Sequence, residues 1–209
     1  MSDRERLLAL LARKSFRLGT FQLSAGGTSD YYVDCRTTTL DAEGAGLVGR
    51  VFLSALRQAD HPVEAVGGLT LGADPIAVSV AVQSTHTPPP VSAFLVRKVE
   101  KTHGTARRIE GTVRPRMRVA VVDDVCTTAA STIAALDAAW EARLDVVSIL
   151  CLVEREEAGG RARLEQHWLQ HQPGPCPFTA LYTARQVRAV HETQIAAGEH
   201  AAALREGLR

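Results

Sequence analysis

The sequence predicts an α/β fold built on a mostly parallel sheet that helices flank on both faces. From residue 63 onward, short runs of β-branched residues alternate with longer helical patterns, which is the order of repeated β-α-β units. The apolar runs are nearly continuous, as is typical of strands covered on both sides. A chain of 209 residues has the size of one domain. We therefore expect a single domain over 1–209, with the core sheet in 60–155 and a small N-terminal cap, or hood, to which 1–40 contribute.

The core elements follow from where these patterns begin and end. The predicted strands are 63–66, 91–96, 119–122 and 146–152, and the predicted helices are 41–58, 74–83 and 131–142. Three prolines at 88–90 exclude a helix and indicate a loop that enters the second strand. The apolar stretch 7–12 is too short for a signal core and predicts one face of a first helix. Near the other end, 178–183 form a possible strand, and a helical tail follows.

Composition narrows the classes of partner. The 24 basic and 23 acidic side chains leave a net charge of +1, so no global field favours nucleic acid or an anionic membrane. Four cysteines lie far apart without a Cys-x-x-Cys pair, which argues against a zinc site or a disulfide framework. No segment approaches the roughly 20 apolar residues of a membrane span. We expect a cytoplasmic protein that binds neither nucleic acid nor membrane, so any anion site must be local.

The pattern in 119–132 carries the most chemical information. An apolar strand ends in Asp123 and Asp124, and small and hydroxyl residues then open a helix. Ligands of open α/β sheets bind beyond the carboxyl ends of strands, where a helix N-terminus offers free N–H groups to an anion. Small side chains in 127–131 let the main chain close around a phosphate, while the two acids suit ribose hydroxyls or magnesium-bound water. An isolated pair of acids fits a simple strand cap equally well.

A second pattern follows the second predicted strand. Residues 98–116 are polar and lack apolar periodicity, which predicts either a functional lid or disorder, and we interpret them as a lid. Basic or potentially basic groups are dense at its start: Arg97, Lys98, Lys101 and His103. A cation about 4 Å from an anionic charge contributes roughly 4 kcal/mol at an effective dielectric of 20, against about 1 kcal/mol in water. The alternative is a solvated charged loop.

These patterns together resemble one family. The string at 119–132 resembles the phosphoribosyl pyrophosphate motif of type I phosphoribosyltransferases, although it has Ala129 and Ala130 where that family usually has glycine. The string Arg-Lys-x-x-Lys-x-His-Gly at 97–104 resembles the mobile catalytic loop of orotate phosphoribosyltransferases. Residues 21–34 resemble their orotate-binding segment, and 67–77 resemble their turn near the pyrophosphate. On this resemblance the chain is identified as a member of the orotate phosphoribosyltransferase family, with the type I phosphoribosyltransferase fold.

The resemblance implies a reaction and its parts. The phosphoribosyl group would pass from phosphoribosyl diphosphate to orotate, giving orotidine 5′-monophosphate and diphosphate for UMP biosynthesis. It implies Mg²⁺ as cofactor and a homodimer, in which Lys98 serves its own subunit while Arg97, Lys101 and His103 reach into the partner's site. The catalytic residues would be Lys101, His103 and Asp124, and His103 would bind or protonate the departing diphosphate. Asp123 and Asp124 would hold the metal through bound water or contact the ribose.

The resemblance also implies the two substrate sites. Phosphoribosyl diphosphate would be bound by Arg97, Lys98, Lys101, His103, Asp123, Asp124, Val125, Cys126, Thr127, Thr128, Ala129, Ala130 and Ser131. Orotate would be bound by Thr127, Arg155, Tyr32 and Val33. From physics alone, Tyr32 and its neighbour Tyr31 favour a core or hairpin role. Arg155 also fits a surface ion pair with Glu154 or Glu156, and Cys126 is favoured as a packed thiol over a nucleophile.

Several alternatives remain open on the sequence. A purine base could replace orotate as acceptor, although the lid pattern and Arg155 favour orotate. A ligand-sensing relative without turnover is the rival of another class, and the two alanines are the feature that favours it. Ser24 and Gly72 stand where many relatives have lysine. His167 and His171 are spaced for metal binding on one helix face, but with no acid beside them in the sequence they favour a plain surface pair.

Overall fold

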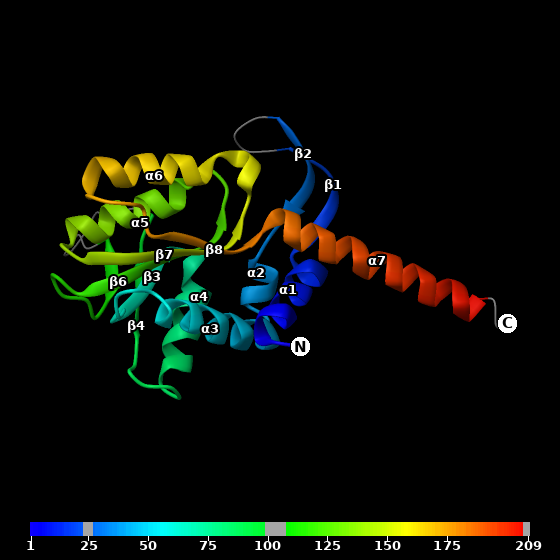
Figure 1. Cartoon of the computed structure of the whole chain (residues 1–209), viewed down its shortest axis with the longest axis horizontal. Coiled ribbons are helices and arrows are strands. Elements are labelled where there is room, and N and C mark those ends of the chain that lie inside the picture. Colours follow the sequence, from blue (N-terminus) through cyan, green and yellow to red (C-terminus); the bar gives the residue numbers. More distant parts are fainter. Residues whose placement is uncertain (23–26, 99–107, 207–209) are drawn as a thin grey trace.

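The expected α/β class is confirmed. The computed structural model describes residues 1–22, 27–98 and 108–206. Its main feature is a six-stranded sheet in the order β5-β4-β3-β6-β7-β8, with helices on both faces (Figure 1). Every neighbouring pair is parallel except the edge strand β5, which runs antiparallel to β4. The strands are β3 (Ala65–Leu69), β4 (Ser92–Val96), β5 (Ile109–Gly111), β6 (Arg118–Cys126), β7 (Asp145–Glu154) and β8 (Phe178–Thr183).

The helices and a separate hairpin complete the fold. The helices are α1 (Asp3–Lys14), α2 (Arg36–Thr39), α3 (Ala42–Arg57), α4 (Ala73–Ser84), α5 (Ala130–Glu141), α6 (Gly160–His171) and α7 (Ala184–Glu206), with a short 3-10 helix η1 (Glu156–Ala158). The hairpin consists of β1 (Phe16–Gln22) and β2 (Thr28–Val33). Of the described helices, none is both long and apolar enough to cross a membrane.

The central sheet separates two hydrophobic cores. Strand side chains alternate between faces, so Ala120 and Val122 of β6 belong to one core while Val119 and Val121 belong to the other. The first core also contains apolar residues of α1, α3, α4 and α7, and the second contains those of α5 and α6. Burial on both faces explains why these strands read as unbroken apolar runs in the sequence.

The strand order places a binding site at a defined point. The chain leaves β3 through α4 to reach β4 on one side, and it leaves β6 through α5 to reach β7 on the other side. The two connections diverge between neighbouring strands β3 and β6, so a crevice opens beyond their carboxyl ends. The predicted phosphate loop and the 67–77 turn both lie at this point, because they follow β6 and β3.

Three details differ from the expectations. Strand β6 continues past the two acids to Cys126, because its pairing with β7 extends to Cys126 opposite Glu154. The stretch expected to lack secondary structure contains β5, which pairs with β4. Helix α6 was not predicted, because only Gly160, Leu164 and Trp168 are buried in an otherwise polar segment. The possible strand 178–183 and the helical tail are both present, as β8 and α7.

Candidate active site

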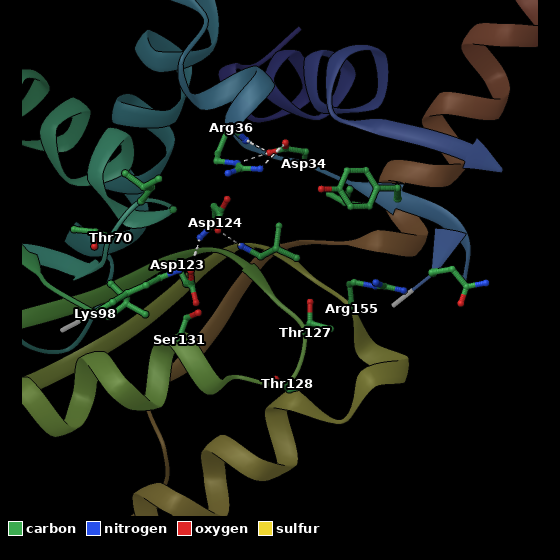
Figure 2. Close-up of a pocket in the computed structure, with 17 residues that line it drawn as sticks. Asp34, Arg36, Thr70, Lys98, Asp123, Asp124, Thr127, Thr128, Ser131 and Arg155 are labelled. Atoms are coloured by element: carbon green, nitrogen blue, oxygen red, sulfur yellow. Dashed lines mark hydrogen bonds and ion pairs between the residues drawn. The ribbon is translucent and has the colours of Figure 1, made fainter. Parts of the chain in front are cut away.

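A cavity of about 640 Å³ opens at the carboxyl ends of β3 and β6 (Figure 2). Its lining comes from the hairpin, from the turn after β3, from the end of β6 with the following loop, and from the residue after β7. The sequence-predicted residues that it brings together are Tyr32, Val33, Lys98, Asp123, Asp124, Val125, Thr127, Thr128, Ser131 and Arg155. Ten predicted residues from segments more than 120 positions apart therefore face one space.

The two acids on β6 dominate the chemistry of one wall. Asp123 is 5% exposed, and its carboxylate accepts hydrogen bonds from the Thr132 hydroxyl at 2.9 Å and from the Asp124 amide at 3.0 Å. Burial and, to a smaller extent, the neighbouring Asp124 carboxylate together raise the pKa of the Asp123 carboxyl to about 7. Burial also raises the pKa of Asp124. This wall therefore has a strong preference for a cation or for hydroxyl donors.

The loop after β6 presents hydroxyls and main-chain amides. Thr127, Thr128 and Ser131 line the cavity (Figure 2). Helix α5 begins at Ala130, between the second and third of these residues. Ala129 caps this helix with φ of 59° and ψ of 11°, a left-handed conformation that glycine adopts more easily. The glycine usual in the family is thus replaced at a position that needs positive φ, whereas Ala130 lies within the helix. The loop geometry suits a phosphate despite the substitution.

Gly72 lies directly against the acid wall. A Cβ atom built on Gly72 would lie 2.4 Å from Oδ1 of Asp124. No larger side chain fits there without moving that carboxylate. A lysine, which the family resemblance predicts at this position, would therefore displace the Asp124 carboxylate from its present position.

Arg155 forms the opposite wall, just past the end of β7. Its side chain is only 11% exposed, and its guanidinium lies 4.5 Å from the centre of the Tyr31 ring. The guanidinium donates to the Ser29 hydroxyl at 3.1 Å and pairs with Glu157 at 3.2 Å. The expected alternative partners were wrong, since Glu154 pairs with Arg161 and Glu156 with Arg185. The cavity thus contains a buried arginine that its neighbours hold in place.

The two tyrosines of the hairpin separate into two roles. Tyr31 is buried against Phe16, with ring centres 5.2 Å apart, and its hydroxyl donates to Glu157. Burial raises the pKa of Tyr31 to about 12. Tyr32 is 44% exposed and lines the cavity with Val33. The core role expected from physics applies to Tyr31, while Tyr32 is free to contact a ligand.

The cavity also contains side chains that sequence reasoning did not single out. Arg36 donates to both carboxylate oxygens of Asp34, at 2.8 Å and 2.9 Å, and both residues line the cavity (Figure 2). The positive charge of Arg36 also partly offsets the rise in the pKa of Asp124. Gln22 lines the cavity at the end of β1. The charged pair Asp34-x-Arg36 directly after the hairpin was the signal that could have identified these residues.

The remaining predicted residues do not all face this space. Arg97 lines an adjoining hollow and pairs with Glu110 of β5 at 3.0 Å. Cys126 is buried behind the loop in the second core, as expected for a packed thiol. Lys101 and His103 lie outside the described residues, as does Ser24. Lys98 is exposed and lines the cavity at its rim.

Comparison with known proteins adds to this geometry. No protein-family model matches the chain. The orotate phosphoribosyltransferase of Aquifex aeolicus is 41% identical over 169 residues, which is 79% of this chain and 91% of that protein. The chain belongs to the orotate phosphoribosyltransferase family.

Solved structures agree with membership of the orotate phosphoribosyltransferase family. The Mycobacterium tuberculosis enzyme in complex with Fe(III) dicitrate is 34% identical, with a TM-score of 0.73 over 89% of this chain and 99% of that one. The same enzyme in complex with 5-phospho-α-D-ribosyl 1-diphosphate has a TM-score of 0.66 at 30% identity, over 88% of this chain and 91% of that one. The type I phosphoribosyltransferase fold expected from the sequence is thereby confirmed.

Proposed function

We propose that this chain transfers the phosphoribosyl group of phosphoribosyl diphosphate to orotate, giving orotidine 5′-monophosphate and diphosphate in UMP biosynthesis. One observation carries the proposal: a single cavity joins the two acids of β6 and the hydroxyl loop after them to Arg155, whose side chain is 11% exposed. The first feature suits a ribose phosphate and the second a carboxylate. Membership of the orotate phosphoribosyltransferase family supports the same assignment.

Phosphoribosyl diphosphate would bind with its 5′-phosphate in the loop at the start of α5. Main-chain N–H groups and the hydroxyls of Thr127, Thr128 and Ser131 provide donors at a helix N-terminus, which favours an anion. Asp123 and Asp124 would accept hydrogen bonds from the ribose hydroxyls. Val125, Cys126, Ala129 and Ala130 would contribute main chain and shape to this loop.

The same acids fit the magnesium ion that this chemistry uses. Mg²⁺ prefers oxygen ligands and keeps several waters, and Asp123 with Asp124 offers adjacent carboxylates on the cavity wall. Burial raises the pKa of both carboxyls, and a bound cation would stabilise their ionised forms. When bound, the ion supplies positive charge to the diphosphate leaving group. Asp124 would hold the ion's water, and Gly72 leaves room for that carboxylate.

Basic side chains around 97–103 would stabilise the leaving diphosphate. Lys98 at the cavity rim would serve its own subunit. Arg97, Lys101 and His103 would act in the partner's site, and Arg97 would then exchange its present partner Glu110 for the diphosphate. Positive charge near the departing oxygen lowers the barrier most when water is excluded. Lys101, His103 and Asp124 would be the catalytic residues.

Orotate would bind against the arginine wall. The guanidinium of Arg155 matches a carboxylate with two parallel hydrogen bonds, and a buried fork of this kind is pre-organised by Ser29 and the Tyr31 ring. Tyr32 and Val33 would contact the pyrimidine ring, and Thr127 would touch both substrates. A purine base carries no carboxylate for Arg155, so this wall favours orotate over a purine acceptor.

A homodimer would allow the basic side chains to be shared between sites. Large apolar side chains are exposed after β3: Leu71, which lines the cavity, at 69%, and Val78 and Val82 of α4 at 52% and 54%. Val78 and Val82 lie one turn apart on α4, so they form one apolar stripe. Burying such a stripe against a second copy is favourable. Light scattering should therefore give the mass of a dimer, and Val78→Glu with Val82→Glu should shift it toward the monomer.

Two broader assignments complete the proposal. We assign the whole chain, 1–209, to one domain. We also assign it to the cytoplasm, where orotate and phosphoribosyl diphosphate would be its small-molecule partners. The four cysteines are free thiols, which agrees with a reducing compartment.

Orotate consumption, followed by absorbance, tests the proposed reaction directly. The complete mixture contains enzyme, orotate, phosphoribosyl diphosphate and Mg²⁺, and each component is omitted in turn. Turnover should require all of them, and adenine or hypoxanthine should not replace orotate. Calorimetry that detects phosphoribosyl diphosphate binding without any turnover would instead favour the ligand-sensing alternative.

A further inference from the structure

Three metal-ligating side chains converge away from the substrate cavity, where α5 and α6 pack together on one face of the sheet (Figure 1). Asp137 belongs to α5, and His167 and His171 lie one turn apart on α6. One ligand atom from each lies within 4.8 Å of those of the other two. The sequence showed only the two histidines, because the acid lies 30 positions before the first of them.

The hydrogen bonds orient these groups as ligands. Nε2 of His167 lies 2.8 Å from Oδ1 of Asp137. Nδ1 of His171 lies 2.9 Å from the main-chain oxygen of His167, and this oxygen can only accept. Nδ1 of His171 therefore donates, which leaves its Nε2 with a free lone pair. A carbonyl that fixes the tautomer in this way is the usual support of a metal-binding histidine.

An aromatic wall fixes the two rings further. The Trp140 ring stacks on His171 with centres 4.9 Å apart and on His167 with centres 5.7 Å apart. The two imidazole rings have centres 4.5 Å apart. A pair of histidines held at this spacing loses little side-chain freedom when it binds an ion.

We propose that Asp137, His167 and His171 form a second metal site, for a late first-row divalent ion such as Zn²⁺. Nε2 of each histidine and one carboxylate oxygen would be ligands, and water would take the fourth position. Ligand atoms about 2.0–2.1 Å from a tetrahedral ion lie roughly 3.3 Å apart. The exposed His171 and the half-exposed Asp137 can swing inward to reach that spacing. On binding, Nε2 of His167 would lose its proton to solvent and Nδ1 would take one from solvent, so the ring stays neutral and the Nε2 lone pair faces the ion.

The ligand chemistry distinguishes this site from the substrate cavity. Imidazole nitrogens favour zinc-like ions, whereas Mg²⁺ prefers the oxygen ligands that Asp123 and Asp124 offer. The two sites would therefore bind different ions from one solution. Millimolar Mg²⁺ should not displace Zn²⁺ from the second site.

The position of the site indicates a structural role. Helix α5 begins at the phosphate loop, and α6 begins against it, since a Cβ on Gly160 would lie 2.4 Å from the Thr127 oxygen. Arg163 of α6 also donates to the Thr128 oxygen at 3.5 Å. An ion that joins the later turns of α5 and α6 would brace the two helices that support this loop.

Tryptophan fluorescence gives a direct measurement, because both tryptophans of the chain lie beside the site. Trp140 stacks on its histidines, and Trp168 lies 5.9 Å from Trp140. Metal-free protein is titrated with Ni²⁺, whose open d shell quenches nearby fluorescence. We expect saturable quenching at one ion per chain. Zn²⁺ should reverse the quenching by competition and should raise the melting temperature.

Two conservative variants and one control decide the assignment. Asp137→Asn keeps an acceptor for His167 but loses the charge, and His171→Gln removes a ligand. Each should weaken Ni²⁺ and Zn²⁺ binding at least tenfold, with the metal-free melting temperature nearly unchanged. His86→Gln, at an exposed histidine outside the cluster, should bind as the unaltered chain does. Equal affinity in Asp137→Asn and His171→Gln, or no saturable quenching in the unaltered chain, would overturn the site.

Activity separates this inference from the proposed function. Asp137→Asn should keep full phosphoribosyl transfer with Mg²⁺, because Asp137 does not line the substrate cavity. If the unaltered chain shows no turnover, the proposed function is contradicted. The result of the Ni²⁺ titration does not depend on that outcome.

Discussion

The wall of the cavity formed by β6 buries two adjacent carboxylates, whereas the wall formed by β7 and the hairpin buries an arginine that already has a carboxylate partner. Asp123 and Asp124 receive hydrogen bonds from a hydroxyl and from main-chain amides, and their pKa values are raised. Arg155 instead pairs with Glu157. At the first wall the ionised carboxylates are unfavourable, and a bound cation would stabilise them. At the second wall the ion pair of Arg155 with Glu157 is favourable, and an anionic ligand must replace Glu157 in it.

In the proposed function, this difference would place the two substrates at different walls of the cavity. A metal-bound diphosphate gains by approaching the first wall, because it brings positive charge to the carboxylates. An anionic pyrimidine gains at the second wall by taking the place of Glu157 at the guanidinium. In the proposed function, the metal-bound diphosphate would therefore lie at the first wall and the orotate carboxylate at the second.

The largest expected effect concerns the leaving group, to which neither wall offers a mobile cation. Lys101→Ala should lower turnover at least a hundredfold while the circular dichroism spectrum stays unchanged, because the developing charge of the diphosphate loses its stabilisation. Single-turnover kinetics measure this change. Unchanged turnover would remove Lys101 from the mechanism and leave the two walls to account for catalysis alone.

The proposed sharing of Lys101 between subunits can be tested by mixing two inactive variants. Mixing Lys101→Ala subunits with Asp124→Asn subunits should restore part of the activity, because some mixed dimers would contain one site with both native residues. Each variant alone serves as the control. Failure of the mixture to recover any activity would contradict sharing of Lys101 between subunits.

The next effect should be confined to the second wall. Arg155→Lys keeps the charge but loses the bidentate fork, so the KM for orotate should rise about 30-fold, corresponding to roughly 2 kcal/mol for a charged hydrogen bond. The KM for phosphoribosyl diphosphate should stay within about twofold. Arg185→Lys, at a residue whose side chain is 83% exposed, is the matched control. Equal changes in both KM values would mean that the walls do not act separately.

The raised pKa of Asp123 in the first wall should make the free energy of unfolding depend on pH. The folded pKa of Asp123 is about 7, above its unfolded value of about 4, so the folded state binds the extra proton between these values. Stability should therefore fall as the pH rises from about 4 to 7. Asp123→Asn should flatten this slope and raise the melting temperature at pH 8 by several degrees. Asp145→Asn, at an exposed acid, should leave the slope unchanged.

The smallest effect concerns strain in the phosphate loop. Ala129 holds a φ of 59°, which costs about 1 kcal/mol relative to glycine. Ala129→Gly should raise the free energy of unfolding by up to about 1 kcal/mol, as measured by urea denaturation. Ala130→Gly is the matched control, and it should destabilise by about 0.5–1 kcal/mol because residue 130 is helical. A loss of stability in both variants would show that residue 129 carries no strain.

The two walls also differ in how well the sequence predicts them. The first wall is contiguous in the chain, so the acids at the end of β6, the hydroxyls after it and the start of α5 could be predicted from one string. The second wall joins Arg155 to hairpin residues more than 120 positions earlier, and only family resemblance connected Arg155 with Tyr32. Arg36 was missed because its role depends on folding next to Asp124.

The fold shows a similar limit. Strands buried on both faces produce long apolar runs, so β3, β4, β6 and β7 could be located from the sequence. The edge strand β5 has three residues and little apolar character, and α6 buries one residue per turn, so neither gave a strong pattern. The approach of Asp137 to His167 depends on how α5 and α6 pack, which periodicity does not encode.

The division of the apolar interior by the central sheet has a consequence for thermal behaviour. The two hydrophobic cores lie on opposite faces of the sheet, and the cavity lies where the connections from β3 and β6 diverge. A substrate held there touches the segments that lead into α4 and into α5. A bound substrate would therefore connect the two sides of the sheet. The unliganded protein should show a less cooperative thermal unfolding transition than the liganded protein.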